Sequence, residues 1–68
     1  MNQDVLNMSI RKFLKHVGVH SQREIEGAIE AGIKSGKLKG NERLAAKMTL
    51  TLAGAELTVV FDDTISLE

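Results

Sequence analysis

The spacing of the apolar residues changes once along this chain, near Lys47, and this change constrains the fold more than any other feature. Before Lys47, apolar residues recur every three or four positions, which is typical of a helix with one buried face. After Lys47, they recur at every second position, the period of a strand with one buried face. We therefore expect an α+β fold, with helices followed by strands, in a single domain of residues 1–68.

The helical part is predicted to contain two helices separated at Gly18. The first is expected from about residue 3 to residue 17, with Asn2 as its N-cap. Gly18 follows the last apolar position and can take the left-handed conformation that ends a helix. The predicted buried stripe of this helix consists of Leu6, Ile10, Phe13, Leu14 and Val17.

The second predicted helix starts at Ser21, whose spacing to Glu24 fits a capping box. It is expected to stop at Gly36, and Gly27 and Gly32 inside it each cost about 1 kcal/mol relative to alanine. Its buried stripe is predicted to consist of Ile25, Ala28, Ile29 and Ile33.

The strand part is predicted to be an antiparallel meander of three short strands, at residues 47–52, 57–61 and 64–67. Turns are expected at residues 53–55 and 62–64. The two helices should cover one face of this meander, because its apolar side chains need a partner layer. These side chains are Met48, Leu50, Leu52, Leu57, Val59, Phe61, Ile65 and Leu67.

Composition excludes several classes of protein. The chain has no Cys and two His, so disulfides, thiolate metal sites and a structural zinc site are not expected, and a cytoplasmic location is favoured. It shows no signal peptide and no apolar run long enough to span a membrane. Phe13 and Phe61 are the only aromatic residues and both fit the core, which disfavours recognition of single strands by base stacking.

The segment of residues 9–26 has features of a helix-turn-helix, with a corner at Gly18 and later hairpins that could serve as a wing. However, Glu24 and Glu26 stand among the positions that would face phosphates, where acids repel. The spacing from Gly18 to Ile25 is also one residue too long, and a third helix is missing. A winged-helix DNA-binding protein is therefore disfavoured.

A second nucleic-acid hypothesis depends on the uneven charge. Residues 1–48 hold all nine basic residues against five acids, a net +4, whereas residues 49–68 carry −4. Several cations around a glycine-containing loop can hold phosphates without reading sequence. The alternative is a solvated loop that binds nothing. We favour it because the acid Glu42 lowers the net positive charge of the basic cluster. The candidate anion-binding or nucleic-acid-binding residues are Lys34, Lys37, Lys39, Arg43 and Lys47.

Catalytic chemistry is not expected. His16 and His20 have the four-residue spacing of two ligands on one helix face, but a helix end at Gly18 would separate them. Asp62 and Asp63 are simpler to explain as a solvated turn than as an acid–base pair. Ser21 beside His20 is explained by the capping box. We therefore predict no enzyme activity, no catalytic residue, no metal and no cofactor.

The blocks "NMSIRKFLKHVGVHSQREIE", "GKLKGNE" and "MTLTL" resemble, in this order, a family of short uncharacterised bacterial proteins described as a domain of unknown function. The resemblance spans nearly the whole chain and implies a self-contained bacterial protein with helices followed by strands. It implies no binding or catalytic residue.

These observations favour a small, non-enzymatic protein-interaction or homo-oligomeric module. The expected partner is an unknown protein or a second copy, because the core is small and a three-stranded meander leaves open edges. Weak binding of nucleic acid or another polyanion through the basic loop is the alternative function.

Overall fold

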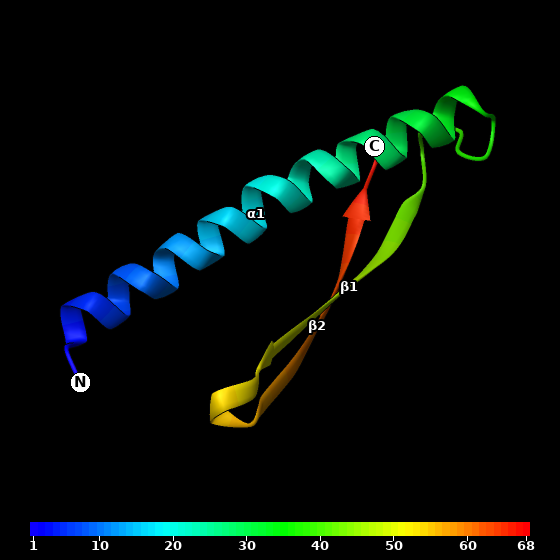
Figure 1. Ribbon diagram of the computed structural model, residues 1–68. Coiled ribbons are helices and arrows are strands. Elements are labelled where there is room, and N and C mark those ends of the chain that lie inside the picture. Colours follow the sequence, from blue (N-terminus) through cyan, green and yellow to red (C-terminus); the bar gives the residue numbers. More distant parts are fainter. The chain divides into compact units, whose positions relative to one another are not determined.

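The computed structural model describes all 68 residues, which form one helix and one β-hairpin (Figure 1). The elements are helix α1 (Gln3–Lys34), strand β1 (Arg43–Leu52), a turn of 3-10 helix (Ala53–Ala55) and strand β2 (Leu57–Ser66). The order of helix before strands is as predicted. The predictions of two helices and of a three-stranded meander are both wrong, because the chain forms one helix and a two-stranded sheet.

The first unit of the chain, Met1–Lys37, consists of α1 and its caps. The Asn2 side chain accepts hydrogen bonds from the backbone N–H groups of Asp4, at 3.0 Å, and Val5, at 3.2 Å. These donors have no partner within the helix, so the predicted N-cap is confirmed and stabilises the first turn. At the other end, Gly36 has a φ of +82°, which confirms the predicted stop.

Helix α1 runs through Gly18 without interruption, so the predicted break there and the new start at Ser21 are wrong. Gly18 does not have the positive φ of a helix-ending glycine. A glycine inside a helix costs about 1 kcal/mol relative to alanine but does not end the helix by itself. Val17, Ser21 and Ile25 follow at four-residue steps, so a straight helix keeps the apolar residues before and after Gly18 on one face.

The second unit, Leu38–Glu68, consists of a loop and an antiparallel hairpin. The predicted turn at residues 53–55 is confirmed as the connection between the strands. It is closed by a hydrogen bond of 3.2 Å from the Glu56 N–H to the Ala53 carbonyl. Glu56 has a φ of +52°, which turns the chain into β2.

The predicted third strand is the second half of β2. The expected turn at residues 62–64 is wrong, because Asp62 pairs with Lys47 and Asp63 with Ala46 inside the ladder. Phe61, Asp63 and Ile65 alternate with their neighbours, so the two-residue period continues through the acids. β1 likewise starts at Arg43, earlier than predicted, because it pairs with all of β2.

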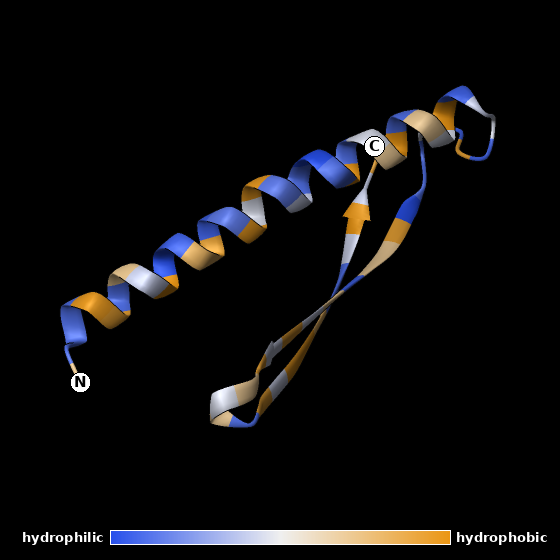
Figure 2. Cartoon of the chain, in the orientation of Figure 1, coloured by the Kyte–Doolittle hydropathy of each residue, from blue (hydrophilic) through white to orange (hydrophobic).

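The two faces of the hairpin differ sharply in polarity, as the alternation of orange with paler and blue segments shows in Figure 2. One face carries mainly Thr, Ser and charged residues. The other, called here the apolar hairpin face, contains one acid, Asp63, among apolar residues. It consists of Leu44, Ala46, Met48, Leu50, Leu52, Leu57, Val59, Phe61, Asp63 and Ile65.

Neither unit buries a residue by itself, apolar or polar. A helix unit and a two-stranded unit each have one apolar face but no second layer to cover it. An isolated two-stranded hairpin is marginally stable at best in water. The apolar side chains that were predicted to form a core therefore remain available for contacts.

Candidate functional site

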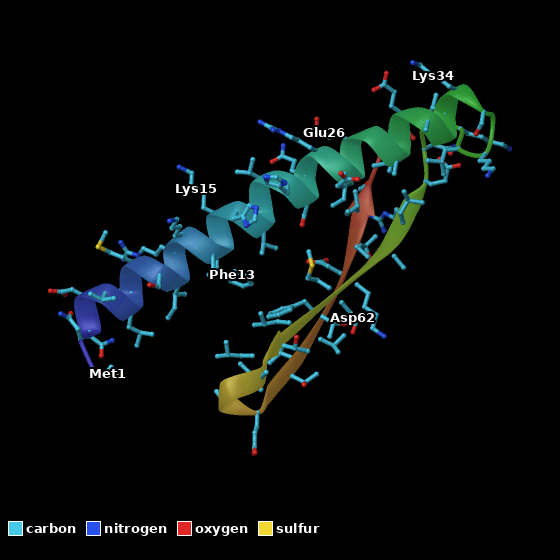
Figure 3. The ribbon with its side chains drawn as sticks, in the orientation of Figure 1. Met1, Phe13, Lys15, Glu26, Lys34 and Asp62 are labelled. Atoms are coloured by element: carbon cyan, nitrogen blue, oxygen red, sulfur yellow. The ribbon has the colours of Figure 1, made fainter.

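One continuous apolar band follows α1 from its first turns to its last. Its members are three or four positions apart, so they lie on one face of the helix. Figure 3 shows Phe13 on the opposite side of α1 from Lys15 and Glu26. We call this band the α1 stripe: Leu6, Ile10, Phe13, Leu14, Val17, Ser21, Ile25, Ala28 and Gly32.

The stripe is exposed where its largest side chains lie. Phe13 is 50% exposed and Leu14 54% exposed. Large side chains occupy the N-terminal half of the stripe. In the C-terminal half, Ala28 and Gly32 are small, whereas Ile25 is large, and the predicted stripe residues Ile29 and Ile33 follow along its margin.

Charge is unevenly distributed along α1. The N-terminal half carries Arg11, Lys12 and Lys15 against Asp4, and the C-terminal half carries Glu24, Glu26 and Glu30 against Arg23 and Lys34. Glu24 lies three residues after Ser21 and four before Ala28, so it stands within the stripe, whereas the other charged residues lie on its far side or at its outer margin. The N-terminal half is therefore positive and the C-terminal half is close to neutral.

The candidate anion-binding residues are divided between the two units. Lys34 and Lys37 belong to the first unit, and Lys39, Arg43 and Lys47 belong to the second. Arg43 and Lys47 share the polar face of β1, where Lys47 is opposite Asp62. The Lys34 ammonium lies 3.3 Å from the Glu30 carboxylate, although both are too exposed for the pair to contribute much.

Glu42 closes the loop that precedes β1, a role that sequence reasoning missed. Its carboxylate accepts a 2.8 Å hydrogen bond from the Lys39 N–H and a 2.9 Å bond from the Gly40 N–H. These two bonds hold the pKa of Glu42 below its ordinary value of 4.5. An internal carboxylate thus occupies the backbone donors that a bound anion would need. The only signal in the sequence was an acid two residues after a glycine.

The loop is expected to loosen as the pH falls through the lowered pKa of Glu42. A carboxyl group whose pKa is lower in the folded state stabilises that state above its ordinary pKa of 4.5 and loses this contribution below it. The Lys39 and Gly40 amide signals should therefore move together in an NMR titration from about pH 5 to pH 2. Glu42→Gln should remove this transition, and signals that stay constant in the unmodified chain would contradict the hydrogen bonds.

His16 and His20 lie side by side because α1 is continuous. Their ring centroids are 4.5 Å apart, with an angle of 80° between the ring planes. The expectation that a helix end separates them is wrong. Two imidazoles supply two nitrogen ligands, and no group of three or more His, Cys, Asp or Glu side chains comes together anywhere in the chain.

Asp62 and Asp63 do not form a carboxylate pair. Adjacent residues of a strand point to opposite faces, so Asp62 lies on the polar face and Asp63 on the apolar face. Ser21 lies inside α1 rather than at a cap. The segment of residues 9–26 likewise belongs to one helix and has no helix-turn-helix corner.

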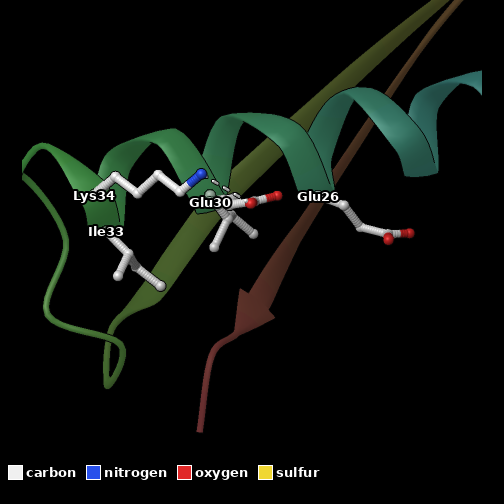
Figure 4. A pocket seen from close by; sticks show the side chains of 5 residues that line it. Glu26, Glu30, Ile33 and Lys34 are labelled. Atoms are coloured by element: carbon white, nitrogen blue, oxygen red, sulfur yellow. Dashed lines mark ion pairs between the residues drawn. The ribbon is translucent and has the colours of Figure 1, made fainter.

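Two shallow depressions lie along α1. One, of about 440 Å³, is open to solvent and is lined by Glu26, Ile29, Glu30, Ile33 and Lys34 (Figure 4). A second, of about 330 Å³, is lined by Val5, Met8, Ser9 and Lys12. Both lie along a single helix, so neither surrounds a small molecule as enzyme pockets do.

No helix of the structure has an apolar stretch of the length needed to cross a membrane. The chain was compared with curated proteins and with solved structures, and none of either matches it. A family model does match, over residues 1–68, and the resemblance inferred from the sequence is confirmed. The chain therefore belongs to a family of unknown function, DUF6494.

Proposed function

We propose that this chain is a non-enzymatic association module whose folded state is completed by another chain, in the first place a second copy. The proposal is carried by one observation: neither unit buries a residue by itself, although 43% of the residues of the chain are hydrophobic. Removing apolar surface from water contributes about 25 cal/mol per Å² and is the main force that stabilises a small domain. The α1 stripe and the apolar hairpin face lack this contribution within their own units.

The hairpin of the same chain is too short to cover the whole α1 stripe. Strands of 10 residues extend about 33 Å, at about 3.3 Å per residue. The α1 stripe, from Leu6 to Gly32, extends about 39 Å, at about 1.5 Å per residue. A single hairpin is therefore shorter than the stripe, which leaves room for contacts with another chain.

Folding and association are then expected to be coupled, so that the midpoint of thermal unfolding rises with protein concentration. Circular dichroism over about two decades of concentration measures the midpoint, and sedimentation velocity on the same samples measures the oligomeric state. A monomer at every concentration, with a cooperative transition at one constant temperature, would contradict the proposal, because the chain would then supply its own core.

Binding of a polyanion through the basic residues stays a prediction. Three features favour association over it: the carboxylate of Glu42 occupies loop N–H groups, Lys34 pairs with Glu30, and Lys47 faces Asp62. A salt titration with random duplex and single strands tests the alternative, and no binding at low salt would contradict it. We also propose a cytoplasmic location, because the chain contains no Cys.

A further inference from the structure

His16 and His20 form a pair of exposed side chains on α1 that are not members of the α1 stripe. We infer that the two imidazoles together bind one divalent transition metal ion of the class of Zn²⁺, Ni²⁺ and Cu²⁺. All three ions accept imidazole nitrogen as a ligand. Both ligands come from one helix of one chain, so the inference does not depend on the proposed self-association.

The continuity of α1 brings the two ligands together. Residues four positions apart in an α-helix are neighbours on its surface, and two histidines at this spacing can bind zinc from one helix face. The expected helix end at Gly18 would separate the rings, but Gly18 lies inside α1. The sequence spacing and the observed helix therefore agree on a two-histidine site.

The distance between the two rings suits a shared ion. Their centroids lie 4.5 Å apart. A metal–nitrogen bond of about 2.0–2.1 Å places the ion about 3.2 Å from each ring centroid. Two such ligands have centroids about 4.5 Å apart when they are about 90° from each other at the metal, and about 5.2 Å apart at the tetrahedral angle. The observed separation therefore needs little adjustment.

The orientation of the rings does need to change. The ring planes meet at 80°, with the edge of one ring toward the face of the other. One ring must turn about its side-chain bonds before both rings direct a nitrogen at the same ion. Both side chains are exposed, and exposed side chains change rotamer within nanoseconds, so this turn is no obstacle to binding.

Two protein ligands define the kind of site. No third His, Cys, Asp or Glu side chain joins the pair, so water completes the coordination of the ion. Structural zinc sites are closed by four protein ligands, whereas a site with open positions can exchange its water and its ion. The ion is therefore expected to be exchangeable and not required for folding.

The charges around the pair are of mixed sign. Lys12 lies four residues before His16, Arg23 three after His20 and Glu24 four after His20. All three side chains are exposed, and salt screens exposed charges, so net charge gives a cation no advantage here. Binding then depends on coordination by imidazole. Mg²⁺ and Ca²⁺ prefer oxygen ligands, so the site is expected to select Zn²⁺, Ni²⁺ and Cu²⁺ over them.

Isothermal titration calorimetry of the chain without a His tag tests the site, with ZnCl₂ and NiCl₂ as the added metal salts. His16→Ala and His20→Ala are each expected to weaken binding about tenfold or more, because the second imidazole binds an ion that the first already holds nearby. Equal affinities in the two variants and the unmodified chain would overturn the inference. Equally tight binding of MgCl₂ would also overturn it.

A matched control keeps two histidines but moves one of them. Gly18→His combined with His20→Ala places the imidazoles two residues apart, on opposite sides of α1. A Cβ at Gly18 meets nothing within 4 Å, so α1 has room for the new side chain. This double variant is expected to bind no more tightly than His20→Ala alone. Affinity equal to that of the unmodified chain would show that a shared face is not needed, and would overturn the inference.

Thermal unfolding followed by circular dichroism gives a second readout. An ion held by both rings binds the helical form of α1, so saturating ZnCl₂ should raise the unfolding midpoint of the unmodified chain. The two alanine variants should show a smaller rise. An equal rise in all three proteins would place the ion elsewhere and overturn the inference. A monomer that binds the ion through both histidines would support the site and contradict the proposed self-association, so the two proposals fail separately.

Discussion

Leu14→Asp is expected to abolish self-association, whereas Met8→Asp should leave it intact. Leu14 lies in the N-terminal half of the α1 stripe, and Met8 lies on the far side of the helix. Each copy of the variant loses a buried leucine, which contributes about 2 kcal/mol, and exposes a carboxylate to an apolar surface. The loss of about 4 kcal/mol per pair corresponds to a thousandfold or so in Kd.

The two variants make a matched pair because both replace an apolar residue of the N-terminal half of α1 with the same acid. Leu14 is 54% exposed and Met8 72% exposed, so exposure within the unit alone predicts no large difference between them. Sedimentation equilibrium measures Kd for each. If both variants remain associated, the stripe is not the interface; if both dissociate, the added charge rather than the face is responsible.

Phe61→Ala is expected to destabilise the protein by about 3 kcal/mol, the cost of removing a phenyl ring from a covered surface. Phe61 is 55% exposed within its own unit and is paired with Met48 on the apolar hairpin face. In a hairpin whose face stays open to water, the same change would remove only a cross-strand contact, at most about 1 kcal/mol. The size of the effect therefore reports whether this face is covered in solution.

Val60→Ala is the control, because Val60 is the neighbouring residue on the polar face and is 46% exposed. Its expected cost is about 0.5 kcal/mol, from β-propensity alone. Urea unfolding of both variants and the unmodified chain at one protein concentration gives the free energies. Equal small losses in the two variants would mean that the apolar hairpin face has no cover in solution.

The periods of the apolar residues predicted which segments are helix and which are strand, but not where each element is interrupted. The residue types at Gly18 and at residues 62–64, two acids and a threonine, favour breaks at these positions. In both places the apolar period continues in phase, from Val17 to Ile25 in α1 and from Phe61 to Ile65 in β2. A local preference worth about 1 kcal/mol is outweighed when the whole face stays aligned.

The candidate site was only partly visible in the sequence. The apolar residues of the stripe were predicted to form a buried face, whereas Ser21 and Gly32 were not, and the structure shows that nothing in their own unit buries any of them. The spacing of the apolar residues indicates which of them share a face. Whether another layer covers that face depends on the number of helices and strands and on how they pack. The loop closed by Glu42 could not be predicted either, because it depends on a side chain reaching backbone N–H groups two and three residues away.

The glycines inside α1 have a consequence for how the protein behaves in a cell. A Cβ at Gly18 or Gly27 would meet nothing within 4 Å, so in the isolated unit these glycines weaken the helix without any gain in packing. Each lowers helix stability by about 1 kcal/mol relative to alanine. Under the proposed association, a newly made copy is expected to unwind readily and to be open to proteases until it meets another. The fraction of chains protected from degradation is then expected to rise once the concentration of the protein exceeds the Kd of association.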